Sequence, residues 1–187
     1  MICIMLDILQ TEKSFILAHL KEGDTAADFT MGNGHDTLFL SQTVGESGKV
    51  YAFDIQPAAL ENTKKRLAEN GAPENYVLIN DSHHNLKKYI DRPIKAGMFN
   101  LGYLPGGDKS VTTLRDTTLA AVNGALDLLA PDGILLIAVY PGHKEGEIEG
   151  DMLADLLSTL DRKKYCCVKF RIINSPSSSY FYIIESK

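Results

Sequence analysis

Apolar residues recur at helical spacing near the start of the chain, between Leu6 and Leu20. This period is typical of a helix that buries one face against a core. The buried face is expected to contain Ile8, Phe15, Ile16, Leu17 and Leu20. The pattern therefore predicts a leading amphipathic helix before the first strand.

Short apolar runs follow this helix, bounded by glycine, proline, asparagine or aspartate, and such runs are typical of strands. The predicted strands cover residues 25–30, 49–54, 76–80, 95–100, 134–140, 165–172 and 180–184. Helices are predicted over residues 37–43, 57–70, 86–90, 113–129 and 152–160, with a turn at 131–133 and a polar loop at 142–150.

Strands that alternate with helices are joined by right-handed crossovers, which make the strands parallel. The run at 134–140 is almost wholly apolar, as expected of a central parallel strand. The last two runs could pair as a hairpin and add an antiparallel strand at one edge. We therefore expect an α/β, Rossmann-like fold with a doubly wound, mostly parallel, seven-stranded sheet. The length predicts a single domain over residues 1–187.

Charge and cysteine content narrow the classes of protein to consider. A formal net charge of -5 argues against a protein that coats nucleic acid through its overall field, although a local basic surface remains compatible with it. The adjacent Cys166 and Cys167 fit neither a disulfide framework nor a zinc site, so we expect ordinary buried thiols and no metal. The ends carry neither a membrane-spanning run nor a signal-peptide pattern, which predicts a cytoplasmic protein without membrane contact.

Glycines and carboxylates gather after the first two predicted strands, where ligands of doubly wound sheets bind. Asp28 and Thr30 end the first strand, and Gly32 and Gly34 allow the backbone to turn tightly against a ligand. Asp54 ends the second strand, where a carboxylate can accept hydrogen bonds from both hydroxyls of a ribose. These two features indicate a nucleoside ligand.

Two classes of cofactor contain such a nucleoside. The pyrophosphate of a nicotinamide dinucleotide favours a third glycine where this chain has Thr37, and Asp36 would repel it. S-adenosylmethionine instead carries an ammonium and a sulfonium cation, which Asp28 or Asp36 would attract in a poorly solvated cleft. The sequence therefore favours S-adenosylmethionine.

The third strand is followed by Asp81, Ser82 and His83, at the position where methyltransferases of this fold commonly contact the adenine. Asp81 or Ser82 could alternatively cap a helix by accepting a backbone N–H. Gln56 could hydrogen-bond the adenosine or face solvent.

Five motifs together resemble one family: DFTMGNGHDT, FDIQ, NDSHHNL, FNLGYLPGGDK and YPGH, of which the fourth is the most distinctive. They are similar to small bacterial proteins first described as ribosomal RNA methylases and associated with methylating the 5-aminomethyl group of 2-thiouridine at the tRNA wobble position. The resemblance extends from Asp28 through the terminal strands. It implies a class I methyltransferase that converts 5-aminomethyl-2-thiouridine to 5-methylaminomethyl-2-thiouridine.

The resemblance also implies which residues contact the cofactor. They are Thr30, Gly32, Asn33, Gly34, Asp36, Thr37, Asp54, Gln56, Ser82, His83 and Asn100. Asp28 joins this set through its charge.

For the acceptor, a neutral primary amine must attack the methyl group in line, so the enzyme chiefly aligns two ligands. The amide oxygen of Asn100 and the carbonyl of Leu101 could accept hydrogen bonds from the amine. Asp108 could position the amine or relay its proton, or serve only in a turn. Tyr103 could stack on a flipped base or pack the loop, and His143 could contact phosphate. The loop residues Pro105, Gly106 and Gly107 are assigned to the same substrate site.

Basic residues form two local groups that could contact tRNA phosphates, or face solvent only. The first group consists of Lys87, Lys88, Arg92 and Lys95, and the second of Lys163, Lys164, Lys169 and Arg171. Strand alternation places Lys169 and Arg171 on one side. A homodimer could assemble a broader basic surface.

Three alternatives stay open at the level of the sequence. The acceptor could be a ribosomal RNA base or a small-molecule amine in the same cleft. A nicotinamide-dependent oxidoreductase would bind the dinucleotide instead. A non-catalytic module would bind the cofactor without methyl transfer.

Overall fold

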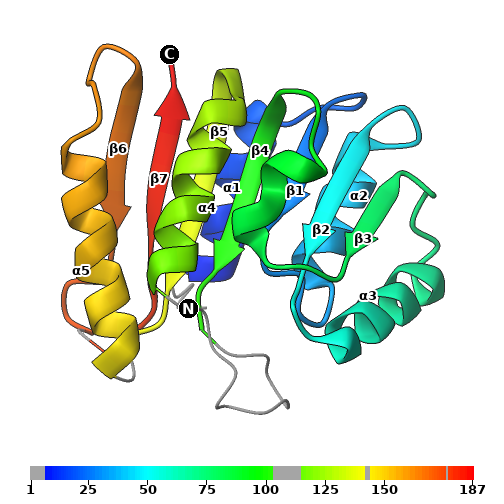
Figure 1. The fold of residues 1–187 in the computed structure, drawn as a ribbon, viewed down its shortest axis with the longest axis horizontal. Helices are drawn as coiled ribbons and strands as arrows, with labels where there is room; N and C mark the ends of the chain where they lie inside the picture. The colour runs from blue at the N-terminus through cyan, green and yellow to red at the C-terminus, as the bar shows by residue number, and fades with distance from the viewer. Residues whose placement is uncertain (1–6, 103–114, 142–143, 176) are drawn as a thin grey trace, which may run out of the picture.

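The computed structural model describes residues 7–102, 115–141, 144–175 and 177–187. Its strands form one sheet in the order β3-β2-β1-β4-β5-β7-β6 (Figure 1). The strands are β1 Thr25–Asp28, β2 Lys49–Phe53, β3 Tyr76–Ile79, β4 Ile94–Asn100, β5 Leu129–Val139, β6 Tyr165–Phe170 and β7 Tyr180–Ser186. Strands β1 to β5 are parallel, and β7 is antiparallel to both β5 and β6. The predicted doubly wound sheet is confirmed, and the antiparallel strand lies one place in from the edge, because β6 forms the edge itself.

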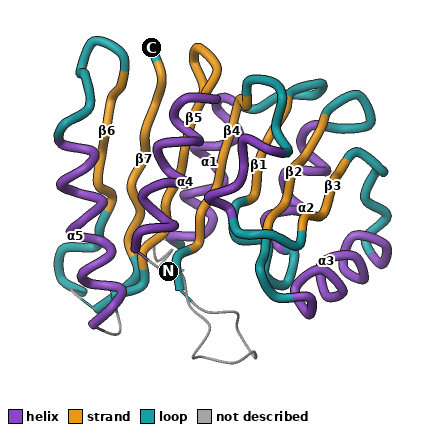
Figure 2. The backbone as a smooth tube through the Cα atoms, viewed as in Figure 1, coloured by secondary structure: helices purple, strands orange, loops and turns teal. Residues whose placement is uncertain are grey.

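Helices cover both faces of this sheet, with α4 and α5 in front and α1 and α2 behind in the view of Figures 1 and 2. They are α1 Ile8–His19, α2 His35–Val44, α3 Pro57–Glu69, the 3-10 helix η1 His83–Lys88, α4 Arg115–Leu128 and α5 Lys144–Ser158. Successive residues of one strand point to opposite faces of the sheet, as in β2. Val50 packs in the layer of α1 and α2, whereas Tyr51 packs in the layer of η1, α4 and α5.

The fifth helix begins eight residues earlier than the sequence pattern predicted, so the expected polar loop at 142–150 is wrong for residues 144–150. Two contacts explain why this polar, glycine-containing run is helical. Glu149 is buried and accepts a hydrogen bond from Thr118 of α4 at 2.7 Å. Gly150 leaves room for the ring of Tyr180, and its carbonyl accepts a hydrogen bond from Tyr182 at 2.9 Å.

Exposure corrects two further predictions about the core. Leu17 is 55% exposed rather than part of the buried face of α1. Cys166 and Cys167 are exposed, because they lie on the edge strand β6, which no helix covers fully. The turn predicted at 131–133 is present as an irregularity within β5, where Asp132 adopts a left-handed φ of 54°.

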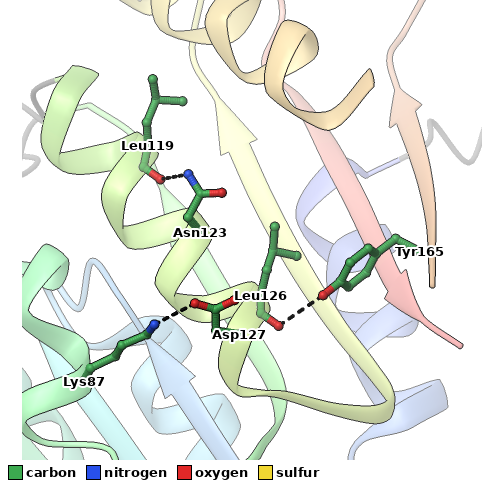
Figure 3. Close-up of polar contacts among 6 residues, drawn as sticks. All are labelled: Lys87, Leu119, Asn123, Leu126, Asp127 and Tyr165. Carbon is green, nitrogen blue, oxygen red and sulfur yellow. Dashed lines mark hydrogen bonds and ion pairs between the residues drawn. The ribbon is translucent and has the colours of Figure 1, made fainter. Parts of the chain in front are cut away.

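Helix α4 is tied to its neighbours at the end remote from the carboxyl ends of the parallel strands. The Tyr165 hydroxyl donates to the Leu126 carbonyl at 3.3 Å, and the exposed Lys87 and Asp127 form an ion pair at 2.6 Å (Figure 3). The candidate site lies at the opposite end of the strands, where β1, β2, β3, β4 and β5 finish; below, the far edge of the sheet means the end at which these parallel strands begin. No helix within the described residues is long and apolar enough to span a membrane.

Candidate active site

The glycine turn between β1 and α2 is built as the sequence predicted. Gly32 and Gly34 have φ values of 50° and 78°, a conformation that favours residues without a Cβ atom. Asp28 is fully buried behind the turn and accepts hydrogen bonds from the Thr30 amide at 3.1 Å and the Thr37 hydroxyl at 2.6 Å. Burial, followed by the negative charge of Asp36, raises the pKa of Asp28 to about 7. Asp28 therefore organises the turn from beneath.

Helix α3 holds the outer side of the same turn, which the sequence did not reveal. The Thr63 hydroxyl donates to the Gly32 carbonyl at 3.1 Å. Arg66 Nε donates to the Asn33 carbonyl at 2.6 Å, and the Asn62 amide donates to the Asn33 side chain at 2.9 Å. The turn is thus fixed from two sides before a ligand arrives.

Asp54 lies directly after β2, beside the turn. One carboxylate oxygen accepts from the Gly32 amide at 3.1 Å, and the other accepts from the Gln56 amide at 2.9 Å. Burial raises the pKa of Asp54, and these backbone hydrogen bonds oppose the shift. Since each carboxylate oxygen can accept a second hydrogen bond, Asp54 retains the capacity to bind a ribose diol. Gln56 is the N-cap residue of α3.

Of the two predicted cofactor contacts after β3, His83 is buried and Ser82 is half-buried. His83 is 8% exposed, with Nδ1 at 3.0 Å from the Phe29 carbonyl and its ring against Phe99. Burial lowers the pKa of His83, and its Nε2 is buried without a hydrogen-bond partner among the described residues. Ser82 is the N-cap residue of η1 but its side chain caps no backbone amide; it contacts His84 at 2.7 Å.

Asn100 ends β4 and links three segments. Its backbone amide donates to the Thr30 hydroxyl at 2.7 Å, and its side-chain amide donates to Asp36 of α2 at 2.7 Å. Its amide oxygen accepts from the Tyr140 hydroxyl at 3.0 Å. The next residue, Leu101, is buried and donates its amide to the Ala138 carbonyl at 3.0 Å. The end of β4 is therefore anchored to the ends of β1 and β5, with a neutral amide between a carboxylate and a phenol.

Tyr140 and Glu12 are site neighbours that sequence reasoning missed. Tyr140 follows β5 and is 38% exposed; partial burial raises its pKa to about 12, with Glu12 as the strongest charge acting on it. Glu12 belongs to the buried face of α1 and is 4% exposed. Its position four residues before Ile16 was an available signal, because that spacing puts a carboxylate on the apolar stripe.

Lys169 and Arg171 lie near the same edge of the sheet, beside the start of β7. The Lys169 ammonium is 4.2 Å from the ring centroid of Tyr180 and 5.3 Å from that of Tyr182. The Arg171 guanidinium is 5.5 Å from the Tyr180 centroid. Tyr180 pairs with Val139 at the end of β5. The predicted common side of the two cations is confirmed by their shared contact with Tyr180.

The other basic residues are not brought together with the site. Lys87 pairs with Asp127, and Lys95 donates to the Pro131 carbonyl at 2.8 Å, both toward the far edge of the sheet. Lys163 and Lys164 precede β6, so they lie at the opposite end of that strand from Lys169. Some predicted substrate residues lie outside the described residues: Tyr103, Pro105, Gly106, Gly107, Asp108 and His143.

The sheet order, the glycine turn and the acidic residue after β2 define a class I methyltransferase, the class whose cofactor is S-adenosylmethionine. The chain belongs to the family described as "Putative rRNA methylase", whose profile matches residues 50–185. A profile of the ubiE/COQ5 methyltransferase family also matches residues 3–92.

Solved structures support this membership over nearly the whole chain. A protein from Clostridium thermocellum, described as a "putative rRNA-methylase", is 40% identical, with a TM-score of 0.94 over 98% of this chain and 99% of that one. A protein from Streptococcus mutans, described as a "putative methyltransferase" and solved in complex with SAH, is 35% identical, with a TM-score of 0.89 over 98% of this chain and 100% of that one.

A curated relative adds a named activity. The chloroplastic tRNA (mnm(5)s(2)U34)-methyltransferase of Arabidopsis thaliana is 38% identical over 167 residues, which is 84% of this chain. The match covers 61% of the plant protein, so the chain spans about three fifths of that relative's length.

Proposed function

We propose that the protein transfers a methyl group from S-adenosylmethionine to RNA, converting 5-aminomethyl-2-thiouridine to 5-methylaminomethyl-2-thiouridine at the tRNA wobble position. The proposed substrate rests on the 38% identity to the plant tRNA (mnm(5)s(2)U34)-methyltransferase. The fit of the cofactor is supported by the glycine turn, the Asp54 carboxylate and the carboxyl groups of Asp28 and Asp36, which complement a cationic ligand.

The arrangement at the end of β4 suits an amine acceptor. S-adenosylmethionine supplies a methyl group on a positively charged sulfur. The amine nitrogen must present an unprotonated lone pair, which forms the new N–C bond as the C–S bond breaks; the resulting ammonium then loses a proton. The Asn100 oxygen can accept a hydrogen bond from the amine beside the one from Tyr140, because an amide oxygen has two lone pairs. A neutral amide aims the amine without favouring its charged form as strongly as a carboxylate would.

Two contacts keep the Asn100 side chain in one orientation. Its NH2 group donates to Asp36, and its oxygen accepts from Tyr140, so rotating the amide by half a turn would set the amide oxygen against the Asp36 carboxylate. Pre-organisation of this kind contributes to rate because the acceptor does not have to order the group that aligns it.

A basic and aromatic surface near this edge supports RNA as the acceptor. Lys169 and Arg171 lie over the ring of Tyr180, and this patch is close to Tyr140 through the pairing of β5 with β7. Cations contribute phosphate contacts in tRNA binding, and their share weakens as salt rises.

The decisive experiment incubates the purified protein with labelled S-adenosylmethionine and bulk tRNA from a strain that lacks this gene. The tRNA is then digested, and the nucleosides are identified by mass spectrometry. We expect label in 5-methylaminomethyl-2-thiouridine, and loss of that product with Asp54→Ala. Asp127→Ala is the matched control, because Asp127 is an exposed aspartate that pairs with Lys87 (Figure 3) and has no contact with the described residues of the candidate site.

Parallel reactions that supply ribosomal RNA or a free primary amine in place of tRNA test the alternative acceptors. Label in ribosomal RNA but not in tRNA would favour the activity that the family description names. Transfer to a free amine without RNA would indicate a small-molecule enzyme. Cofactor binding without transfer to any of these would contradict the proposed function.

A further inference from the structure

Glu12 is a buried carboxyl group whose role neither the glycine turn nor the acceptor amide explains. It lies on the face of α1 that packs against the sheet and is 4% exposed. No described residue donates a hydrogen bond to its carboxyl group, whose oxygens are not fully enclosed. Carboxyl groups are almost never buried in this way without a partner, because desolvation strongly disfavours their charged form.

The direction of α1 places Glu12 toward the site. At the far end of the helix, His19 contacts the Asp132 carbonyl at 2.8 Å and Glu185 at 3.2 Å, and both partners belong to the far edge of the sheet. The first turns of α1 therefore lie at the end of the sheet where β4 and β5 finish, and the charge of Glu12 acts on Tyr140 there.

Four titratable groups on the surrounding elements act on Glu12. Asp36 of α2 is the strongest charge, Asp7 and Lys13 act from α1, and Tyr140 faces it from the end of β5. Lys13 does not neutralise it by an ion pair; the Lys13 ammonium is 5.1 Å from the Phe39 ring centroid instead. Burial first, and then Asp36, raise the pKa of Glu12 to about 8. Glu12 and Asp36 thus repel each other.

We propose that Glu12 is a further residue of the cofactor site: with Asp36 it binds the cationic end of S-adenosylmethionine, and it releases its proton when that cation binds. A nearby positive charge favours the carboxylate over the acid, so cofactor binding and proton release are coupled. The proposal rests on the cofactor of this class and does not depend on tRNA as the acceptor.

The test is isothermal titration calorimetry of S-adenosylmethionine into the RNA-free protein, in two buffers of different ionisation enthalpy at each pH. A carboxyl group with a pKa of about 8 is about nine-tenths protonated at pH 7, so the wild type should release close to one proton from Glu12 at that pH. Glu12→Gln should release fewer protons, by close to one per cofactor bound. From pH 6 to pH 8 the affinity of the wild type should rise relative to Glu12→Gln by about fiftyfold, because the ionised fraction of Glu12 in the free protein rises by that factor.

Glu46→Gln is the matched control, because Glu46 is exposed on the turn between α2 and β2, at the far edge of the sheet. It should release as many protons as the wild type. Equal proton release by the wild type and Glu12→Gln would overturn the proposal, as would a loss of affinity in Glu12→Gln that is the same at every pH. The wild type alone provides a second check, since no proton release at pH 7 is incompatible with the proposal. None of these results depends on methyl transfer, so they are separable from a failure of the tRNA assignment.

Discussion

Replacing Glu12 with glutamine is expected to stabilise the cofactor-free protein, by an amount that grows as the pH rises. Glutamine matches the protonated carboxyl group in size and remains neutral. In the wild type the folded state raises the pKa of Glu12 from 4.5 to about 8. The folded protein therefore holds a proton that the unfolded chain has lost, and the associated stability is fully present only at low pH.

The difference in pKa between the folded and unfolded states sets the size of the effect. A tenfold change in a protonation equilibrium corresponds to about 1.4 kcal/mol. The free energy of unfolding of the wild type should therefore fall behind that of Glu12→Gln by about 1 kcal/mol at pH 5, about 2 kcal/mol at pH 6 and about 4 kcal/mol at pH 8. Above that pH the difference should level off, because Glu12 is then ionised in both states.

Urea denaturation of the two proteins without cofactor, at these three pH values, measures the difference directly. Asp28 also carries a raised pKa, but it is present in both proteins and its contribution largely cancels. Glu46→Gln should follow the wild type at every pH. A difference between the wild type and Glu12→Gln that does not change with pH would refute the reasoning, because it would show that Glu12 has the same protonation in the folded and unfolded states.

Three further variants test the turn, the far edge and the basic surface. Gly34→Ala should destabilise the protein by at least about 2 kcal/mol in thermal unfolding, because φ is 78° and the new Cβ would lie 2.8 Å from the Thr63 Cα atom; unchanged stability would contradict the tight packing of the turn. Asn75→Leu removes two buried hydrogen bonds and one partly buried hydrogen bond, and it should cost about 3 kcal/mol in urea denaturation while leaving the calorimetric affinity for S-adenosylmethionine unchanged. Lys169→Ala with Arg171→Ala should weaken tRNA binding several-fold in filter binding and reduce its salt dependence, with cofactor affinity as the control.

The elements that were predicted well have a clear hydrophobic pattern or begin at a residue, such as proline, that marks a helix start. The near-continuous apolar run of β5 and the proline that starts α3 both occur where expected. The start of α5 was missed because Gly146 and Gly150 suggest a loop, whereas Gly150 is required by the Tyr180 ring across the layer. Contacts between distant segments of this kind leave no local signal.

The site residues also separate into those that a local motif predicts and those that depend on contacts between distant segments. Gly32 and Asp54 were predicted because a motif fixes their spacing, and the structure brings them into a hydrogen bond at 3.1 Å. The Asn100–Tyr140 contact spans forty residues and depends on the pairing of β4 with β5. Glu12 could be seen only as an interruption of an apolar stripe, and its meaning depends on Asp36, which the fold places beside it.

The carboxyl groups near Asn100 pose a problem for an enzyme whose acceptor must be a neutral amine. In the cofactor-free protein, negative charge on these groups would favour the protonated, unreactive ammonium form of that amine. A cationic cofactor compensates this negative charge when it binds. Before that, a carboxyl group that still holds its proton adds no negative charge of its own. On the proposed function, the same groups that attract S-adenosylmethionine therefore cease to hold the amine in its charged form once the cofactor is bound. This favours binding of the cofactor before RNA and leaves the neutral Asn100 amide as the group that aligns the amine.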